Sequence, residues 1–368
     1  LTHIGSSAFY NSSISNIFIP KKVKSIEPAC FSRCENLQKV IFSEQSQLQI
    51  IKNNAFAYSG IEKILLPSNL SMLKKKCFYS CPNLQEVDLC ENSKLNFIEE
   101  EVFSLSSIKN LTIPSSIIEL RHGWCSSTNN LNNIKILQNK KKRIKCIDNN
   151  VIIGRTNPKI DKYDCILFAP RNIEEVKIPS SIKRISSYAF QECKKLKKVS
   201  FMKNSKLEII DDYSFCNCSF KEITIPSSVI AIEKRSFSME KLQKVTFLKE
   251  SQLKSISIKA FSNSSLAKIK IPSSVSFIGK KAFSSCQNLS IFEFEKNSKL
   301  EIIDKKAFSK TALKNISIPS HVKTINEFVF NECLQLQKVV FLEKSEIKQI
   351  HSISFIGSSL TEITIPSS

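Results

Sequence analysis

Cysteine and histidine are the residues of this sequence that could most readily do chemistry. The chain has 13 Cys and 4 His. The paired Cys-x-x-Cys spacing of structural zinc sites does not occur, and Cys216-Asn217-Cys218 alone is a weak signal. The histidines lie in unrelated contexts, at His3, His122, His321 and His351. Six glycines are too few for phosphate-cradling loops or a nucleophile elbow. The sequence therefore predicts no enzyme, no metal site and no cofactor.

Positive charge is the second feature that could recruit a partner. Lys and Arg number 54 against 33 Asp and Glu, a formal net charge of +21, which favours polyanionic partners. The densest positive run contains Lys140, Lys141, Lys142 and Arg143. Most such runs are solvated loops, and this interpretation is favoured. The alternative hypothesis is contact with an acidic glycan or an anionic membrane surface.

Two ladders of residues recur along the chain and predict its architecture. An Ile-Pro or Leu-Pro pair closes at Pro20, Pro67, Pro114, Pro179, Pro226, Pro272, Pro319 and Pro366. A second ladder runs through Phe9, Phe31, Phe56, Phe78 and Phe103, then Phe190, Phe215, Phe237, Phe261, Phe283, Phe308, Phe330 and Phe355. Six proline intervals are 46 or 47 residues long and each contains two Phe of the ladder, whereas the interval from Pro114 to Pro179 is 65 residues long and contains none. The steps of the Phe ladder mostly alternate between 22 and 25 residues, so each of the six shorter proline intervals holds two coils. Coils of 22–25 residues fall in the range of leucine-rich repeats.

The pattern within one coil indicates a short strand followed by turns. Val40 and Phe42 alternate with Lys39 and Ile41, which is the period of a strand with one face inward. Pro67 has no N–H for a ladder and ends its strand. We therefore expect an α/β leucine-rich-repeat solenoid with one continuous parallel β-sheet, short helical or irregular turns on the opposite wall, and one inserted β-hairpin.

The hairpin is expected in the long interval between Pro114 and Pro179. Two strand-like runs, Val151-Ile152-Ile153 and Cys165-Ile166-Leu167-Phe168, flank a turn-like stretch with Gly and Pro. They predict a hairpin that protrudes from the solenoid, where insertions often serve binding. The expected division is 1–120 for the N-terminal coils, 121–172 for the irregular repeat, and 173–368 for the C-terminal coils.

Most cysteines occupy fixed slots of the repeat, which favours a structural role. Cys30 and Cys77 stand where other coils have Ala, so they behave as small buried residues. Another slot, three residues after the ladder Phe, holds Cys in several coils. Cys193 and Cys218 fill it in adjacent coils, so they are close enough either to form a disulfide or to remain a pair of thiols.

Outward strand positions are the candidate contact surface. Glu and Lys partly alternate there between neighbouring strands, so cross-strand ion pairs are expected and a uniform basic groove for nucleic acid is unlikely. A local positive excess remains at Lys244, Lys268 and Lys270. In three successive coils the outward slot instead holds Phe18, Ile41 and Leu65. This apolar patch indicates a partner contact, although β-branched and aromatic residues also simply suit strands.

The repeated phrases resemble a known family. Ile225-Pro226-Ser227-Ser228-Val229, and Ile271-Pro272-Ser273-Ser274-Val275 followed by Ala282-Phe283-Ser284-Ser285-Cys286, closely resemble BspA-like leucine-rich repeats. The bias to Lys, Asn, Ile and Ser resembles the family's protozoan-parasite branch. The resemblance implies a surface-displayed antigen or adhesin that binds host proteins or other cells. It carries over no binding residue, because the family has no shared ligand signature.

Two classes of function follow. The leading hypothesis is a non-catalytic cell-surface adhesin or antigen that contacts proteins or acidic glycans. The alternative is an intracellular repeat scaffold for protein–protein interaction, which abundant thiols would suit. An enzyme with its catalytic part elsewhere is a distant third. No apolar run is long enough to span a bilayer, and no signal or anchor is visible, since Leu1 already lies inside a coil.

Overall fold

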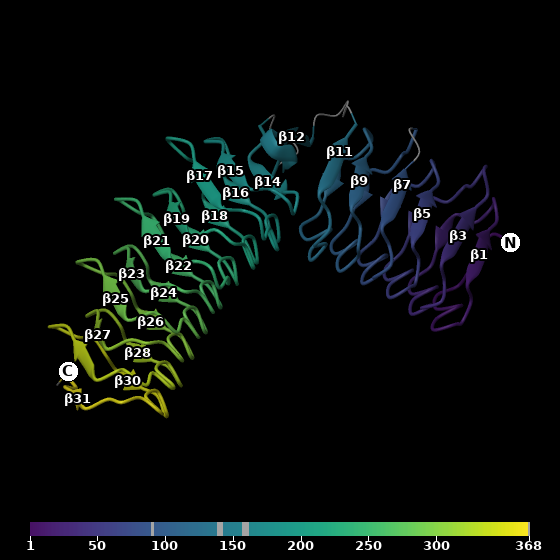
Figure 1. Ribbon diagram of the computed structural model, residues 1–368. Coiled ribbons are helices and arrows are strands. Elements are labelled where there is room, and N and C mark those ends of the chain that lie inside the picture. The colour runs from purple at the N-terminus through teal and green to yellow at the C-terminus, as the bar shows by residue number, and fades with distance from the viewer. Residues whose placement is uncertain (90–91, 138–142, 157–161, 367–368) are drawn as a thin grey trace. The chain divides into compact units, whose positions relative to one another are not determined.

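The computed structural model describes residues 1–89, 92–137, 143–156 and 162–366 of the chain. Contacts between residues group into two compact units, residues 1–173 and residues 174–368. Both units are built from stacked coils of the kind that the two ladders predict (Figure 1). Among the described residues, no helix has the length and apolar character needed to cross a bilayer.

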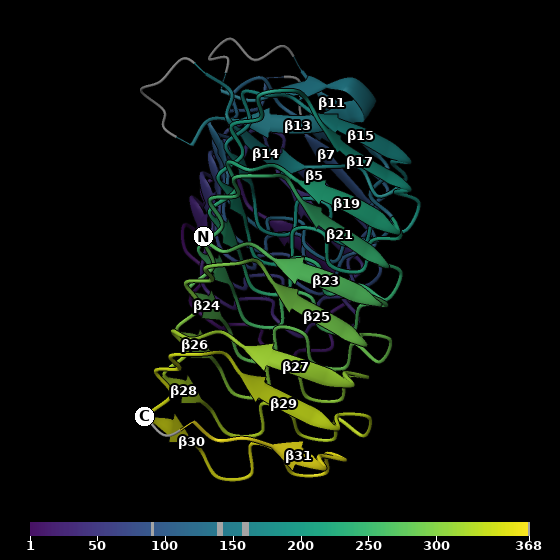
Figure 2. The ribbon, with the colours of Figure 1, turned by 90° about the vertical axis from the view of Figure 1, so that its left-hand side faces the viewer.

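Each coil contributes one segment to each of three walls. The strand wall is formed by the longer strands, such as the four-residue strand β3 (Lys39–Phe42). The side wall is formed by two-residue strands, such as β4 (Ile50–Ile51). The turn wall is formed by the Phe-bearing turns, such as residues 53–58. Figure 2 shows the strand wall and the side wall of unit 2 as separate stacks.

Unit 1 has six strands in one parallel sheet on its strand wall. They are β1 (Asn16–Ile19), β3, β5 (Lys63–Leu66), β7 (Glu86–Leu89), β9 (Asn110–Ile113) and β11 (Asn133–Ile136). A second parallel sheet forms the side wall, from β2 (Ser25–Ile26), β4, β6 (Met72–Leu73), β8 (Phe97–Ile98) and β10 (Glu119–Leu120). The sequence pattern of Leu48-x-x-Ile51 therefore marks a second short strand rather than only a turn.

Unit 2 repeats the same plan. Its strand wall holds β15 (Glu175–Ile178), β17 (Lys198–Phe201), β19 (Glu222–Ile225), β21 (Lys244–Phe247), β23 (Lys268–Ile271), β25 (Ile291–Phe294), β27 (Asn315–Ile318), β29 (Lys338–Phe341) and β31 (Glu362–Ile363). Its side wall holds β16 (Arg184–Ile185), β18 (Ile209–Ile210), β20 (Ala231–Ile232), β22 (Ser255–Ile256), β24 (Phe277–Ile278), β26 (Ile302–Ile303), β28 (Thr324–Ile325) and β30 (Gln349–Ile350).

A column of stacked Phe rings runs through the core behind the turn wall. In unit 1 the rings of Phe9, Phe31, Phe56, Phe78 and Phe103 follow one another at centroid distances of 5.1–5.8 Å, nearly parallel. In unit 2 the column runs from Phe190 to Phe355 with the same geometry. No coil buries its ring alone, and each ring covers the next. The predicted leucine-rich-repeat solenoid is confirmed.

The strand wall of unit 1 is one continuous sheet as expected, whereas that of unit 2 is divided into separate sheets, because the strands of both units associate most strongly in pairs. A strand that ends at proline is joined over its full length to the strand of the next coil, as in the four-residue register of β1 with β3 and of β5 with β7. The junctions between the second strand of one pair and the first strand of the next pair have fewer paired residues. β3 and β5 pair only at Lys39 and Lys63, and β17 and β19 belong to separate sheets.

Proline explains this pairing. In a full-length pair, the residue after the second strand donates its N–H to the last carbonyl of the strand before it. Ser43 N–H donates to the Ile19 carbonyl (3.1 Å) and Leu248 N–H to the Ile225 carbonyl (3.1 Å). In the following coil that position is a proline, such as Pro67, which has no N–H to donate. Every second junction therefore opens at its proline end.

The predicted hairpin is confirmed, but its strands do not protrude. β13 (Val151–Gly154) pairs antiparallel with β14 (Cys165–Phe168), and β12 (Lys145–Ile147) adds a third antiparallel strand before a short 3-10 turn, η1 (Asp148–Asn150). Both hairpin strands are largely buried because they are apolar on both faces. Trp124 packs on Phe168, with ring centroids 5.6 Å apart. The hairpin strands thus extend the core of unit 1. The expected boundaries at 120 and 172 stay predictions.

Candidate binding surfaces

The cysteine slots are buried and serve packing. The twelve cysteines within the described residues are thiols. In the slot after the ladder Phe, the thiol donates to the carbonyl of the preceding coil's Phe, from Cys34 to Phe9 (2.9 Å) and from Cys81 to Phe56 (3.1 Å). The alternate coil fills the slot with Ser or Thr, as where the Ser59 hydroxyl contacts the Cys81 thiol at 3.5 Å. Burial raises the pKa of Cys81 to about 11, so its thiol stays protonated near neutral pH.

Cys193 and Cys218 occupy this slot in adjacent coils, as their sequence positions predict. Both thiols are buried, and Cys218 donates to the Phe190 carbonyl at 3.0 Å. The same hydrogen bond is made by the structural cysteines of other coils. The expectation that they form either a disulfide or an adjacent pair of thiols stays a prediction.

No three His, Cys, Asp or Glu side chains of the described residues are grouped so that they could hold a metal ion.

Of the basic run, Lys140, Lys141 and Lys142 lie outside the described residues, whereas Arg143 is half-buried. Its contact with an acidic glycan or a membrane surface stays a hypothesis.

The expected cross-strand ion pairs are present on the strand wall. Lys63 lies 2.9 Å from both Glu86 and Asp88, and these hydrogen-bonded partners raise the pKa of Lys63. In unit 2, Lys268 pairs with Glu293 at 2.9 Å. Such pairs neutralise charge between neighbouring strands.

The predicted excess at Lys244, Lys268 and Lys270 is therefore smaller than the sequence indicates. Lys268 is paired with Glu293, and Lys270 lies opposite that same glutamate in the register. Lys244 lies opposite Glu222. The contact role of these three lysines stays a prediction.

The apolar patch is exposed as its sequence positions predict. Phe18 lies opposite Ile41 in the register of β1 and β3, and Leu65 occupies the same slot on β5. Their side chains are 57%, 42% and 56% exposed, respectively. The patch ends at β7, where Asp88 lies opposite Leu65. Three large apolar side chains on neighbouring strands form a contiguous surface of the kind that marks contacts.

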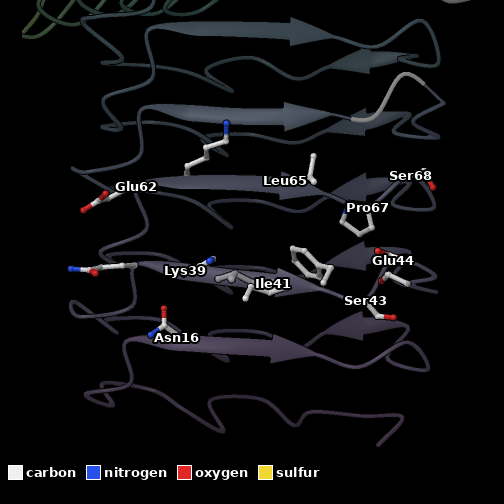
Figure 3. A pocket seen from close by; sticks show the side chains of 14 residues that line it. Asn16, Lys39, Ile41, Ser43, Glu44, Glu62, Leu65, Pro67 and Ser68 are labelled. Carbon is white, nitrogen blue, oxygen red and sulfur yellow. The ribbon is translucent and has the colours of Figure 1, made fainter.

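A groove with a cavity volume of about 630 Å³ lies within this patch, over the open junction between β3 and β5. Figure 3 shows Ile41 and Leu65 on neighbouring strands, Lys39 towards one end, and Pro67 with Ser68 at the other. Beyond the Lys39–Lys63 pair the two strands have no ladder partner in each other, which leaves the space between them. Phe18 belongs to the patch but does not line the groove.

The groove residues that sequence reasoning missed come from the proline junction. Half-buried Phe42 ends β3, and Pro67 follows β5 in the equivalent position of the next coil. The signal was present as the alternation of Ile-Phe-Ser and Leu-Leu-Pro at the strand ends. This alternation predicts where each strand ends, but within one coil it does not show that neighbouring strands separate there.

Unit 2 has a groove of the same construction with different walls. It lies at the open junction of β17 and β19, includes Pro226, and has a cavity volume of about 870 Å³. Ser200 and Thr224 occupy the slots that Ile41 and Leu65 occupy in unit 1, and Lys198 and Lys244 add positive charge. This groove is therefore polar and basic.

Stacked coils with a Phe column and an open strand wall define a leucine-rich-repeat scaffold of the non-catalytic, binding kind. The family comparison agrees. The model of the BspA type leucine rich repeat region matches in six copies, over residues 2–132, 162–290 and 254–368. The chain belongs to this family. Residues 133–161, which include β12 and β13, fall between the matched ranges.

Solved structures share the fold at low identity. The pneumococcal vaccine antigen PcpA is 22% identical, with a TM-score of 0.60 over 95% of this chain and 70% of that one. A leucine-rich cell surface protein from Faecalibacterium prausnitzii is 20% identical, with a TM-score of 0.58 over 92% and 82%. A leucine-rich-repeat protein from Eubacterium ventriosum is 19% identical, with a TM-score of 0.64 over 99% and 82%. No curated protein matches the chain. The resemblance to the protozoan branch stays a prediction.

Proposed function

We propose that this protein is a cell-surface binding module, of adhesin or antigen type, that captures a protein through the groove between β3 and β5. The observation that carries this proposal is the open junction flanked by Ile41 and Leu65. Removing these side chains from water on binding supplies the driving force, at roughly 25 cal/mol per Å² of apolar surface buried. A groove with an apolar centre and few polar groups at its ends is the usual form of a recognition site.

The groove also indicates the chemistry of its partner. Lys39 is exposed at one end, and among the described residues it has no ion-pair partner, whereas neighbouring Lys63 is held by two carboxylates. A carboxylate on the partner would therefore meet Lys39 while an aliphatic or aromatic side chain lies between Ile41 and Leu65. We infer a protein segment that combines these two groups.

Surface display is supported by the relatives. The family is of BspA type, and one structural neighbour is described as a cell surface protein while another is a vaccine antigen. The alternative, an intracellular scaffold, would use the same groove. The thiols do not separate the two, because eleven of the twelve within the described residues are buried and serve packing. Immunolabelling of intact and of permeabilised source cells separates them, since only surface display labels intact cells.

The groove is tested by Ile41→Lys. The protein is expected to capture a partner from intact cells or matrix, and the variant is expected to lose capture because an ammonium replaces the apolar wall. Ile291→Lys is the matched control. Ile291 is the same residue type on the strand wall of unit 2, and is 45% exposed against 42% for Ile41. Circular dichroism checks that both variants fold. Unchanged capture by Ile41→Lys refutes the groove.

A further inference from the structure

The turn wall of unit 2 carries a column of cations. The turns that follow β20, β22, β24 and β26 (Figure 1) place one cation in the same slot of four successive coils. These residues are Arg235, Lys259, Lys281 and Lys306. Lys234, Lys280 and Lys305 each precede a member of this set and widen it. We call the seven residues the basic column.

Backbone hydrogen bonds hold the column in register. Lys259 N–H donates to the Lys280 carbonyl (3.0 Å), and Lys281 N–H donates to the Lys305 carbonyl (3.0 Å). The Phe rings behind these coils stack at centroid distances of 5.3–5.8 Å, which sets the step between neighbouring cations. The positive charges therefore repeat at a short and regular spacing along the stack.

Few carboxylates neutralise the column. Among the described residues, Lys305 alone of the seven has an ion-pair partner, Glu327 at 2.6 Å. The nearby carboxylates bind other donors, since Glu233 accepts from the Ser257 hydroxyl (2.7 Å) and Asp304 accepts from the Lys305 N–H (2.6 Å). The strand wall, with its Lys–Glu pairs, does not share this imbalance.

The column members also influence one another's protonation. The pKa of Lys259 is lowered, first by partial burial and then by the charges of Arg235, Lys281, Lys234 and Lys280. Mutual repulsion of this kind is relieved when an anion binds, and a chain of anions relieves it at every coil at once.

Backbone geometry does not account for the choice of cations. Four members of the basic column, Arg235, Lys259, Lys281 and Lys306, have positive φ, from 52° to 61°. This conformation suits Gly or Asn better than Arg or Lys. In unit 1 the same slot holds Asn54, then Lys76 beside Glu101, a charge-balanced pair 3.4 Å apart. Four consecutive cations are a feature of unit 2.

We propose that the basic column binds a linear sulfated or carboxylated polysaccharide that runs along the stack and contacts successive coils. A single small anion would contact only one or two cations, whereas a linear polyanion matches the repeat of the column. A single nucleic-acid strand requires aromatic platforms for its bases. The aromatic rings at the two ends, Tyr213 and Phe328, are already covered by cations of the column.

The test uses heparin oligosaccharide as the probe, with affinity measured calorimetrically at low and at physiological salt. The column variant combines Arg235→Asn, Lys259→Asn, Lys281→Asn and Lys306→Asn, since Asn tolerates positive φ. The control variant combines Lys221→Gln, Lys249→Gln, Lys296→Gln and Lys314→Gln, which are exposed lysines of the same unit outside both the basic column and the groove. It removes the same charge.

The column variant is expected to bind heparin at least tenfold more weakly, while the control variant stays within about threefold of the wild type. Added salt should weaken wild-type binding through screening. Equal losses in the two variants would show that total charge, not the column, binds heparin, and no loss in either would also overturn the proposal. Single-stranded RNA and phosphatidylserine vesicles serve as competing probes. If the column variant lost more affinity for either of these probes than for heparin, a polysaccharide ligand would be refuted. The proposal does not rest on the groove of unit 1, so Ile41→Lys should leave heparin binding unchanged.

Discussion

Units 1 and 2 are built from the same coils but present different chemistry at equivalent positions. The groove of unit 1 is flanked by Ile41 and Leu65, whereas the groove of unit 2 has Ser200 and Thr224 in the same slots. The turn wall of unit 1 is charge-balanced, whereas that of unit 2 carries the basic column. The buried residues set one architecture, so the outward slots are free to vary. Each unit can therefore serve a different partner.

The Phe column is what the two units share, and its removal should have the largest effect. Phe56→Ala in unit 1 and Phe261→Ala in unit 2 each delete a fully buried ring that stacks on two others. We expect each to lower the free energy of unfolding by about 3–5 kcal/mol. Urea unfolding measures both, with fluorescence of Trp124, the single tryptophan, as a reporter within unit 1. A loss confined to one of the two variants would contradict a shared architecture.

Exchanging the groove walls should convert one groove toward the other. Ile41→Ser with Leu65→Thr gives unit 1 the outward side chains of unit 2, and partner capture should fall by at least thirtyfold, about 2 kcal/mol. The reciprocal exchange, Ser200→Ile with Thr224→Leu, serves as the gain-of-contact variant. Capture is measured by surface plasmon resonance once the partner is isolated. If the variant with Ile41→Ser and Leu65→Thr binds as the wild type does, the aliphatic walls are not the contact.

Buried thiols should make stability fall at alkaline pH, and more in unit 1 than in unit 2. Burial raises the pKa of Cys81 and of Cys286 to about 11 and of Cys125 to about 12, whereas an exposed thiol ionises near 9.0. Between pH 9 and 11 the unfolded chain has lost these protons and the folded chain still holds them. Stability is therefore complete below pH 9 and is lost as the pH rises through 11.

Unit 1 has more such thiols than unit 2. Burial also raises the pKa of Cys30, Cys77 and Cys146 in unit 1, and that of Cys216 and Cys333 in unit 2. Urea unfolding at pH 8, 9 and 10 measures the loss, with Trp124 fluorescence reporting unit 1 and far-ultraviolet circular dichroism reporting the whole chain. Cys81→Ala is expected to reduce the fall in the free energy of unfolding between pH 8 and pH 10. A free energy of unfolding that stays level from pH 8 to pH 10 would contradict burial of the thiols.

Much of this architecture could be predicted from the sequence, because it follows from residues that repeat. The Phe ladder, the proline ladder and the alternation around Val40 predict stacked coils with the correct buried side chains. Phe18, Ile41 and Leu65 were placed outward correctly, since the period of a strand decides which face a residue occupies.

Other features depend on contacts between coils, which one coil's pattern does not contain. The opening at Pro67 arises because the carbonyl of Phe42, in another coil, lacks a donor there. The basic column lies in turns whose left-handed residues stack only once the coils are in register. The hairpin was expected to protrude because it interrupts the repeat, yet its apolar strands are buried in unit 1.

Pro67→Ala tests the construction that both grooves share, and should have the smallest effect on stability. The alanine supplies an N–H in the position from which Ser43 N–H donates to Ile19 in the preceding coil. We expect this N–H to donate to the Phe42 carbonyl and draw β5 toward β3, which narrows the groove. The new hydrogen bond contributes about 1 kcal/mol, and loss of the proline costs up to about 1 kcal/mol through the unfolded chain. The free energy of unfolding should therefore change by less than about 1 kcal/mol.

The closure itself is measured by hydrogen exchange. The amide of residue 67 should exchange at least tenfold more slowly than an unprotected amide, and partner capture should weaken because the space between Ile41 and Leu65 is reduced. Pro226→Ala should close the groove of unit 2 in the same way, although its walls are polar. An unprotected amide at both positions would show that the open junctions have another cause. Protection at only one would show that the two grooves differ in backbone construction as well as in their walls.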